Sequence, residues 1–145
     1  MTAKEFLNQY RDAERKARMF RREYEKELEL IDTVRSTADI DGLPRGNGIN
    51  KRVEDRAVRL ADKAAEWKIA ELDALHMRQI VFDMISDIPD TAGEVLYLRY
   101  IDCLTWKNVC ASIPMTWPSV RKHHDKGLAI VSKKIQEVTY EPVVL

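Results

Sequence analysis

The chain has 145 residues, about the length of one domain, and 45% of them are hydrophobic, which is enough to bury a core and argues against a disordered polypeptide. Charged residues make up 33% and aromatic residues 8%, and glycine and proline number five each, which is typical of long helices rather than of a β-sandwich or a glycine-rich barrel. Acidic and basic residues balance at 24 each, so a nucleic acid or an anionic membrane would have to be bound by a local patch.

Two further features limit the class of protein. Apolar runs such as Val95–Leu98 stop at four residues, whereas a membrane span needs about 20. No long apolar stretch follows Lys4 and Glu5, so we expect no signal peptide, no membrane partner and a cytoplasmic location. Cys103 and Cys110 have no second pair and no histidine at ligand spacing, so we expect buried, reduced, structural thiols and neither a metal nor another cofactor.

A long first helix is predicted from the N-terminus. Thr2 and Glu5 form a capping box, which is typical of a helix start. Apolar residues then alternate at spacings of four and three, with Glu27 as an interruption, so the pattern predicts a coiled-coil helix to about residue 38. The apolar seam consists of Phe6, Tyr10, Ala13, Ala17, Phe20, Tyr24, Ile31, Val34 and Ala38.

A second long helix follows a loop. Residues 39–49 (DIDGLPRGNGI) are rich in glycine and proline, so we expect a loop there, with Asn50 capping a helix that runs to about Ser86. Two long helices joined by a short loop fold back as an antiparallel hairpin. The seam of the second helix is predicted at Val53, Ala57, Leu60, Ala64 and Trp67.

The two halves of this hairpin differ in character. From Trp67 to Ile85, twelve of nineteen residues are apolar and they occupy more than one face, so either the C-terminal region or a second copy of the chain must pack on them. The other half, residues 23–29 with 51–63, is charged, and we expect it to be solvated.

Three shorter helices are predicted after Pro89, followed by a tail at 139–145. The expected fold is therefore all-α, with a helical hairpin at 1–87 and a separate domain at 88–138. The three helices are 91–102 after the cap Asp90, 106–112 after the cap Thr105 and before Pro114, and 117–137 after the cap Thr116.

The last two of these helices carry the candidate site. A short helix, a four-residue turn and a basic amphipathic helix form the layout of a helix-turn-helix DNA reader. Residues 116–136 contain five basic residues and one acidic residue, which supplies a local positive patch. The inner face is predicted to consist of Val120, His124, Gly127, Leu128, Val131 and Ile135.

Catalytic and metal roles are disfavoured at His123 and His124, because successive helical residues point about 100° apart and no nucleophile stands beside them. We expect no enzyme activity. His124 is predicted to be a hydrogen-bonded core histidine, and Trp106 to pack against Val95 or Leu98.

The segment Leu98–Ile135 resembles region 4 of bacterial sigma-70 factors, through L-R-Y at 98–100, L-T-x-x-x-V at 104–109 and V-R-x-x-x-x-K-x-L at 120–128. The whole chain, beginning M-T-A-K-E-F-L, resembles small phage and prophage transcriptional regulators of Gram-positive bacteria. The resemblance implies sequence-specific binding of double-stranded DNA near promoters in a bacterial host cell, with RNA polymerase as a possible further partner.

The resemblance places the base-reading positions at the start of the last helix, on Trp117, Pro118, Ser119, Arg121 and Lys122. Arg121 and Lys122 would donate to guanine in the major groove, and Ser119 to a base edge or a phosphate. Trp117 would contact a thymine methyl group or the sugar backbone. Phosphates would be neutralised by Lys107, Lys126 and Lys133.

One recognition helix with few donors binds weakly, and helix-turn-helix proteins commonly read two half-sites about 34 Å apart, so we expect a homodimer formed through the coiled-coil arm. Two other functions stay open. One is an adaptor that binds RNA polymerase or another phage or host protein through the arm or the helix-turn-helix. The other is a DNA-packaging subunit similar to small terminase subunits, which would form a ring of many copies.

Overall fold

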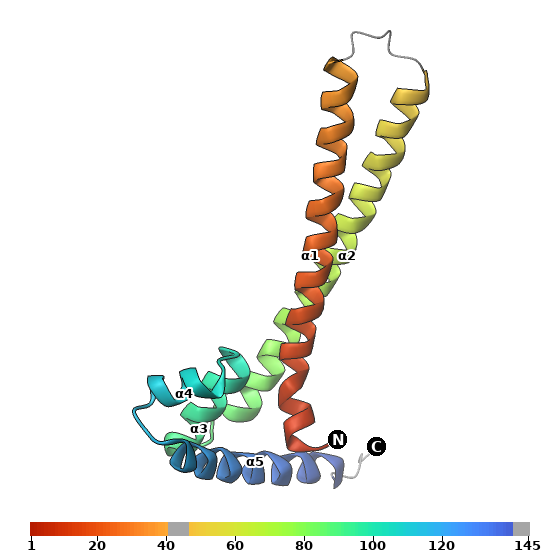
Figure 1. The fold of residues 1–145 in the computed structure, drawn as a ribbon. Coiled ribbons are helices and arrows are strands. Elements are labelled where there is room, and N and C mark those ends of the chain that lie inside the picture. The colour runs from red at the N-terminus through yellow and green to blue at the C-terminus, as the bar shows by residue number, and fades with distance from the viewer. Residues whose placement is uncertain (41–46, 141–145) are drawn as a thin grey trace. The chain divides into compact units, whose positions relative to one another are not determined.

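The computed structural model describes residues 1–40 and 47–140, with side chains for 1–36 and 51–138, and this part of the chain is helical without any strand. The all-α prediction is confirmed, including the long helical hairpin. The elements in chain order are α1 (Ala3–Ile40), α2 (Asn47–Ile85), α3 (Asp90–Leu96), the π-helical turn η1 (Tyr97–Ile101), α4 (Trp106–Ser112) and α5 (Trp117–Tyr140) (Figure 1).

The helix ends differ by a few residues from those predicted. α1 continues to Ile40 and α2 begins at Asn47, so the ends of the predicted loop 39–49 are helical, while residues 41–46 lie outside the described residues. α5 continues to Tyr140, so the predicted tail begins later, and 141–145 also lie outside the described residues.

The predicted capping box at the start of α1 is confirmed. The backbone N–H of Glu5 donates to Oγ1 of Thr2 over 3.2 Å, and the N–H of Thr2 donates to Oε2 of Glu5 over 2.9 Å. Two of the free N–H groups at the helix start are thereby satisfied.

The chain packs as two compact units. The arm is the hairpin of residues 13–74, and the C-terminal unit consists of residues 1–12 and 75–140. Among the described residues, no helix combines the length and the apolar character that a membrane crossing requires.

The seam of the arm follows the predicted heptad on α1, where Ala17 and Ile31 are buried and Phe20 and Tyr24 are half-buried. On α2, Ala57 is exposed, so the prediction that Ala57 belongs to the seam was wrong. The preceding residue, Arg56, takes the inward position instead. The inward positions of α2 keep the alternation of three and four, and they are Val53, Arg56, Leu60, Lys63, Trp67, Ala70 and Ala74.

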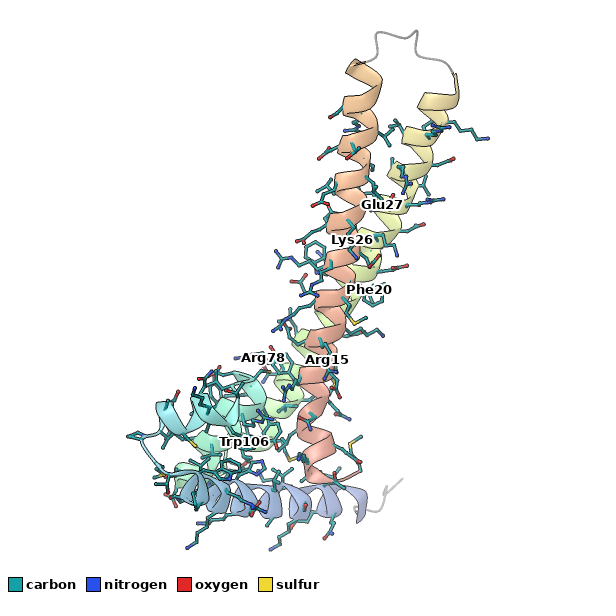
Figure 2. The ribbon with its side chains drawn as sticks, viewed as in Figure 1. Arg15, Phe20, Lys26, Glu27, Arg78 and Trp106 are labelled. Atoms are coloured by element: carbon teal, nitrogen blue, oxygen red, sulfur yellow. The ribbon has the colours of Figure 1, made fainter. Side chains whose placement is uncertain are left out.

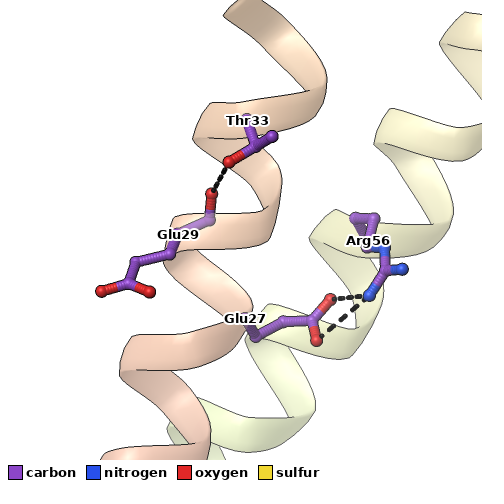
Figure 3. Close-up of polar contacts among 4 residues, drawn as sticks. All are labelled: Glu27, Glu29, Thr33 and Arg56. Atoms are coloured by element: carbon purple, nitrogen blue, oxygen red, sulfur yellow. Dashed lines mark hydrogen bonds and ion pairs between the residues drawn. The ribbon is translucent and has the colours of Figure 1, made fainter.

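Glu27 is a buried member of this seam, with 8% of its surface exposed, so its predicted solvation was wrong. Nη1 of Arg56 lies 3.1 Å from Oε1 and 3.5 Å from Oε2 of Glu27 (Figure 3). Two oppositely charged groups at inward positions satisfy each other only in one alignment of the helices. Polar groups at inward positions are able to fix the register of a coiled coil, and this pair joins α1 to α2 across the seam.

The core of the C-terminal unit has two clusters, and α3 and α4 both pack on α5 (Figure 1). The first cluster joins the start of α1 and the end of α2 to α3, η1 and α5. Its buried members are Ala3, Leu7, Val81, Ile85, Ile88, Ala92, Leu96, Tyr100, Ile101 and Val131. The second lies between α3, α4 and the start of α5, and its buried members are Val95, Val109, Ile113 and Val120.

The predicted helix 91–102 has the expected inner residues but not a uniform α-helical backbone. Its last turn is the wider η1, in which the N–H of Asp102 donates to the carbonyl of Tyr97 over 3.1 Å. Asp90 was wrongly predicted as the cap, because it is the first helical residue and has φ of 62°, while the extended Pro89 holds the cap position.

Candidate nucleic-acid interface

The start of α4 is set by the cap Thr105 and its end by Pro114, as predicted. Oγ1 of Thr105 accepts a hydrogen bond from the N–H of Asn108 over 3.3 Å. Ile113 is extended, with φ of −107° and ψ of 105°, because a residue that precedes a proline avoids the α region. α4 therefore ends at Ser112, and α5 begins four residues after Ile113, at Trp117.

The inner face of α5 is buried as predicted. Val120 and Val131 have no exposed surface and His124 has 6%. Gly127 is buried against α3, since a Cβ built on it would lie 2.8 Å from Cδ1 of Leu96. The remaining two residues of the predicted face, Leu128 and Ile135, are half-buried.

Most of the predicted site residues are exposed on the C-terminal unit. α5 contributes four exposed cations, Arg121, Lys122, Lys126 and Lys133, and α4 contributes Lys107. Lys134, the fifth basic residue of α5, is directed inward instead. Its Nζ donates to the carbonyl of Met84 over 2.8 Å and pairs with Asp87, and this pairing lowers the pKa of the Asp87 carboxyl below its ordinary value.

Two predicted contact residues at the start of α5 are engaged within the unit. The Ser119 side chain is half-buried, and its hydroxyl lies 3.7 Å from the sulfur of Met115. Trp117 is 42% exposed, and its ring packs against the ring of Trp106 with 5.0 Å between centroids. Part of the Trp117 surface therefore remains accessible, whereas Ser119 faces the turn.

His124 is a hydrogen-bonded core histidine, as predicted. Its Nε2 lies 2.7 Å from the hydroxyl of Tyr100, and Trp106 packs edge-on at 4.7 Å between ring centroids. Trp106 (Figure 2) also packs against the cluster that contains Val95, which confirms its predicted core role. The guanidinium of Arg99 lies 4.6 Å from the Trp106 ring centroid, a contact that the sequence pattern did not predict.

The environment of His124 favours the neutral imidazole. Burial lowers the pKa of His124 below its ordinary value of 6.5, and the positive charges of Lys4 and Arg99 lower it further. Asp125, whose Oδ1 lies 3.8 Å from Nδ1, opposes this shift by raising the pKa. The net lowering favours a neutral His124 side chain at neutral pH, with its Nε2 hydrogen-bonded to the Tyr100 hydroxyl.

Acid is therefore expected to destabilise the C-terminal unit through His124. Below a pH of about 6.5 the unfolded chain binds a proton that the folded chain does not bind, so stability falls as the pH is lowered toward the folded pKa. Urea denaturation of the wild type and of His124→Gln at several pH values measures this contribution. The variant should lose less stability between neutral and mildly acidic pH, and parallel losses in both proteins would contradict the assignment.

The two cysteines are half-buried rather than buried, which corrects the prediction. Cys103 follows η1 with φ of 56°, and the next N–H, of Leu104, donates back to the carbonyl of Leu98 over 3.0 Å. Within residues 1–40 and 47–140, no group of three or more histidine, cysteine, aspartate or glutamate side chains is placed to hold a metal ion.

Comparison with known proteins finds no family model, no curated protein and no solved structure that matches this chain.

Proposed function

We propose that the protein is a sequence-specific DNA-binding transcriptional regulator of phage or prophage type, with α4 and α5 as a helix-turn-helix. One observation carries the proposal. α5 buries one face in the C-terminal unit and exposes Arg121, Lys122, Lys126 and Lys133 on the other. A helix held this way is able to enter the major groove of DNA, which admits one α-helix.

The positions of these side chains suggest separate roles. Residues near the start of a recognition helix contact base edges, so Arg121 and Lys122 are proposed to donate to guanine. Lys126 and Lys133 farther along α5, and Lys107 on α4, are proposed to neutralise phosphates, which adds affinity without sequence information. The exposed part of Trp117 is available for a thymine methyl group or the sugar backbone, whereas Ser119 would first have to leave Met115.

The proposed setting is the cytoplasm of a bacterial host, where the protein would act at promoters, without catalysis, beside RNA polymerase. We also propose that it acts as a homodimer. Val58 and Ile69 are each 62% exposed and Leu72 is 55% exposed, on the side of α2 that faces away from the seam of the arm. A second copy of the chain that covers these side chains would remove apolar surface from water.

The proposal predicts that Arg121→Ala with Lys122→Ala abolishes the selection of any DNA motif, because these two side chains supply the base contacts. The measurement is enrichment of random and source-genome duplex fragments on the purified protein at about 0.15 M salt, near physiological ionic strength. A matched control, Arg52→Ala with Arg59→Ala, removes two exposed cations from α2 instead. Circular dichroism reports whether each variant keeps its helices.

Enrichment of one motif by the wild type and the control, and not by the double variant, is the expected result. A palindromic motif and a mass of twice 16.9 kDa would accompany a dimer. No enrichment beyond the double variant would contradict the proposal and favour an adaptor, and a ring of many copies would favour a packaging subunit.

A further inference from the structure

The outward face of α1 in the arm carries a row of cations that the proposed helix-turn-helix does not use. Four exposed residues together form the arginine stripe, Arg15, Arg18, Arg22 and Lys26. Figure 2 labels Arg15 and Lys26, which stand at its two ends. The spacings of three, four and four residues place the stripe on one side of the helix. Ala17, Phe20 and Tyr24 of the seam occupy the opposite side.

The charge around the stripe is strongly unbalanced, although the whole chain is neutral. Residues 15–22 (RKARMFRR) contain five basic residues and no acidic residue. The other two of these five interact within the arm. Nζ of Lys16 lies 5.9 Å from the ring centroid of Phe20, and Arg21 pairs with Glu25 over 3.1 Å. This segment is therefore a local concentration of positive charge in a chain whose net charge is zero.

The ion pairs of the stripe are exposed and easily exchanged. Nε of Arg18 lies 3.5 Å from Glu14, and Nζ of Lys26 lies 3.6 Å from Glu23. The cationic side chains are 67% and 70% exposed, respectively. Exposed pairs of this kind contribute little to stability, so an incoming anion is able to replace the glutamates at small cost.

The chemistry of the stripe fits a row of phosphates better than a protein surface. Three of its four members are arginine, whose planar guanidinium binds phosphate through two parallel N–H donors. Apolar side chains form the energetic centre of most protein interfaces, whereas the exposed apolar side chains near the stripe are two, Met19 and Leu30, which are separated by about three turns of α1. The stripe extends over about 16 Å, a length of duplex DNA that displays about ten phosphates.

We propose that the arginine stripe binds the phosphate backbone of duplex DNA without reading its sequence. The arm then supplies affinity, and α5 supplies discrimination between bases. The choice of duplex DNA as the ligand rests on the proposed function, while the stripe itself rests on the exposed cations of α1.

The test is the affinity of the full chain for a labelled duplex of random sequence, followed by fluorescence anisotropy over a range of salt concentrations. Each phosphate contact contributes about 0.9 to the slope of log affinity against log salt. Replacement of all four residues by glutamine (Arg15→Gln, Arg18→Gln, Arg22→Gln, Lys26→Gln) should therefore reduce this slope by about 3 to 4. A control removes the same number of exposed cations from α2, by Lys51→Gln, Arg52→Gln, Arg59→Gln and Lys68→Gln.

A slope that falls in the stripe variant and stays near the wild-type value in the control supports the proposal. Equal slopes in wild type and stripe variant, or equal losses in stripe variant and control, would overturn it. Displacement of the duplex by polyglutamate at equal charge would overturn the choice of DNA as the ligand.

The Arg121→Ala, Lys122→Ala variant in parallel separates this proposal from the proposed function. If the salt slope depends on the stripe but the wild type selects no motif, the role of the stripe is supported and the proposal of a sequence-specific regulator is overturned. If the wild type selects a motif and the salt slope is the same in the stripe variant, the proposed function is supported and the role of the stripe is overturned. If the wild type binds no duplex, both proposals are overturned.

Discussion

Replacement of Leu96 by alanine is expected to lower the free energy of unfolding of the C-terminal unit by about 3 to 5 kcal/mol. Leu96 has no exposed surface and belongs to the larger hydrophobic cluster. The loss combines the transfer free energy of the missing methyl groups with the cost of the cavity that remains. This cavity is hard to close, because the surface that faces Leu96 on α5 is the backbone at Gly127, which has no side chain to move into it.

Urea denaturation followed by circular dichroism measures this effect. Leu75→Ala is the matched control, since it removes the same atoms from a leucine of the C-terminal unit, on α2, that is 59% exposed. We expect the control to change the free energy of unfolding by less than about 1 kcal/mol. Similar losses in the two variants would show that Leu96 is not a central core residue.

The second large effect is expected at Gly93, where alanine should destabilise the C-terminal unit by about 1 to 3 kcal/mol or more. Intrinsic helix propensity alone predicts the opposite sign, because alanine is favoured over glycine by about 1 kcal/mol within a helix. A Cβ on Gly93 would overlap the backbone carbonyl oxygen of Ile88, which the turn at Pro89 and Asp90 holds against α3. A backbone atom cannot rotate away as a side chain does.

Gly127→Ala serves as the comparison, because both glycines are helical and closely packed. At Gly127 the nearest atom is the end of the Leu96 side chain, at 2.8 Å, which is able to shift slightly. Thermal unfolding should therefore show a lower midpoint for Gly93→Ala than for Gly127→Ala. A Gly93→Ala protein that is more stable than the wild type would contradict this account of the turn.

The hairpin and the order of the helices could be predicted because their signals are local. The alternation of apolar residues at three and four, the Thr2–Glu5 box and the prolines at 89 and 114 all act within a few residues. The π-helical turn at Tyr97–Ile101 has no such signal, since its sequence is compatible with an ordinary α-helix. The contacts of this wider turn are long-range. Tyr100 is buried within it, and the Tyr100 hydroxyl is hydrogen-bonded to His124 on α5.

The polar contacts that sequence patterns do not predict join residues far apart in the chain. Glu27 contacts Arg56 across the arm, 29 residues away in the sequence. The predicted seam was based on apolar residues alone, so it treated Glu27 as an interruption and included Ala57 in place of Arg56. Lys134 pairs with Asp87, 47 residues away. The charge count over residues 116–136 therefore included Lys134 in the positive patch, although its side chain is directed inward. The exposed cations of α5 were predicted correctly because their exposure depends only on the buried face of their own helix.

The placing of the three tryptophans has a spectroscopic consequence. Trp67 lies in the arm, 5.4 Å from Tyr24 between ring centroids, whereas Trp106 and Trp117 meet at the start of α5. A Trp67→Phe protein would confine tryptophan emission to Trp106 and Trp117, the first residues of α4 and α5. Because Trp106 also touches His124, and a protonated imidazole quenches indole fluorescence, the emission of this protein would report both titration of the core and the docking of α5.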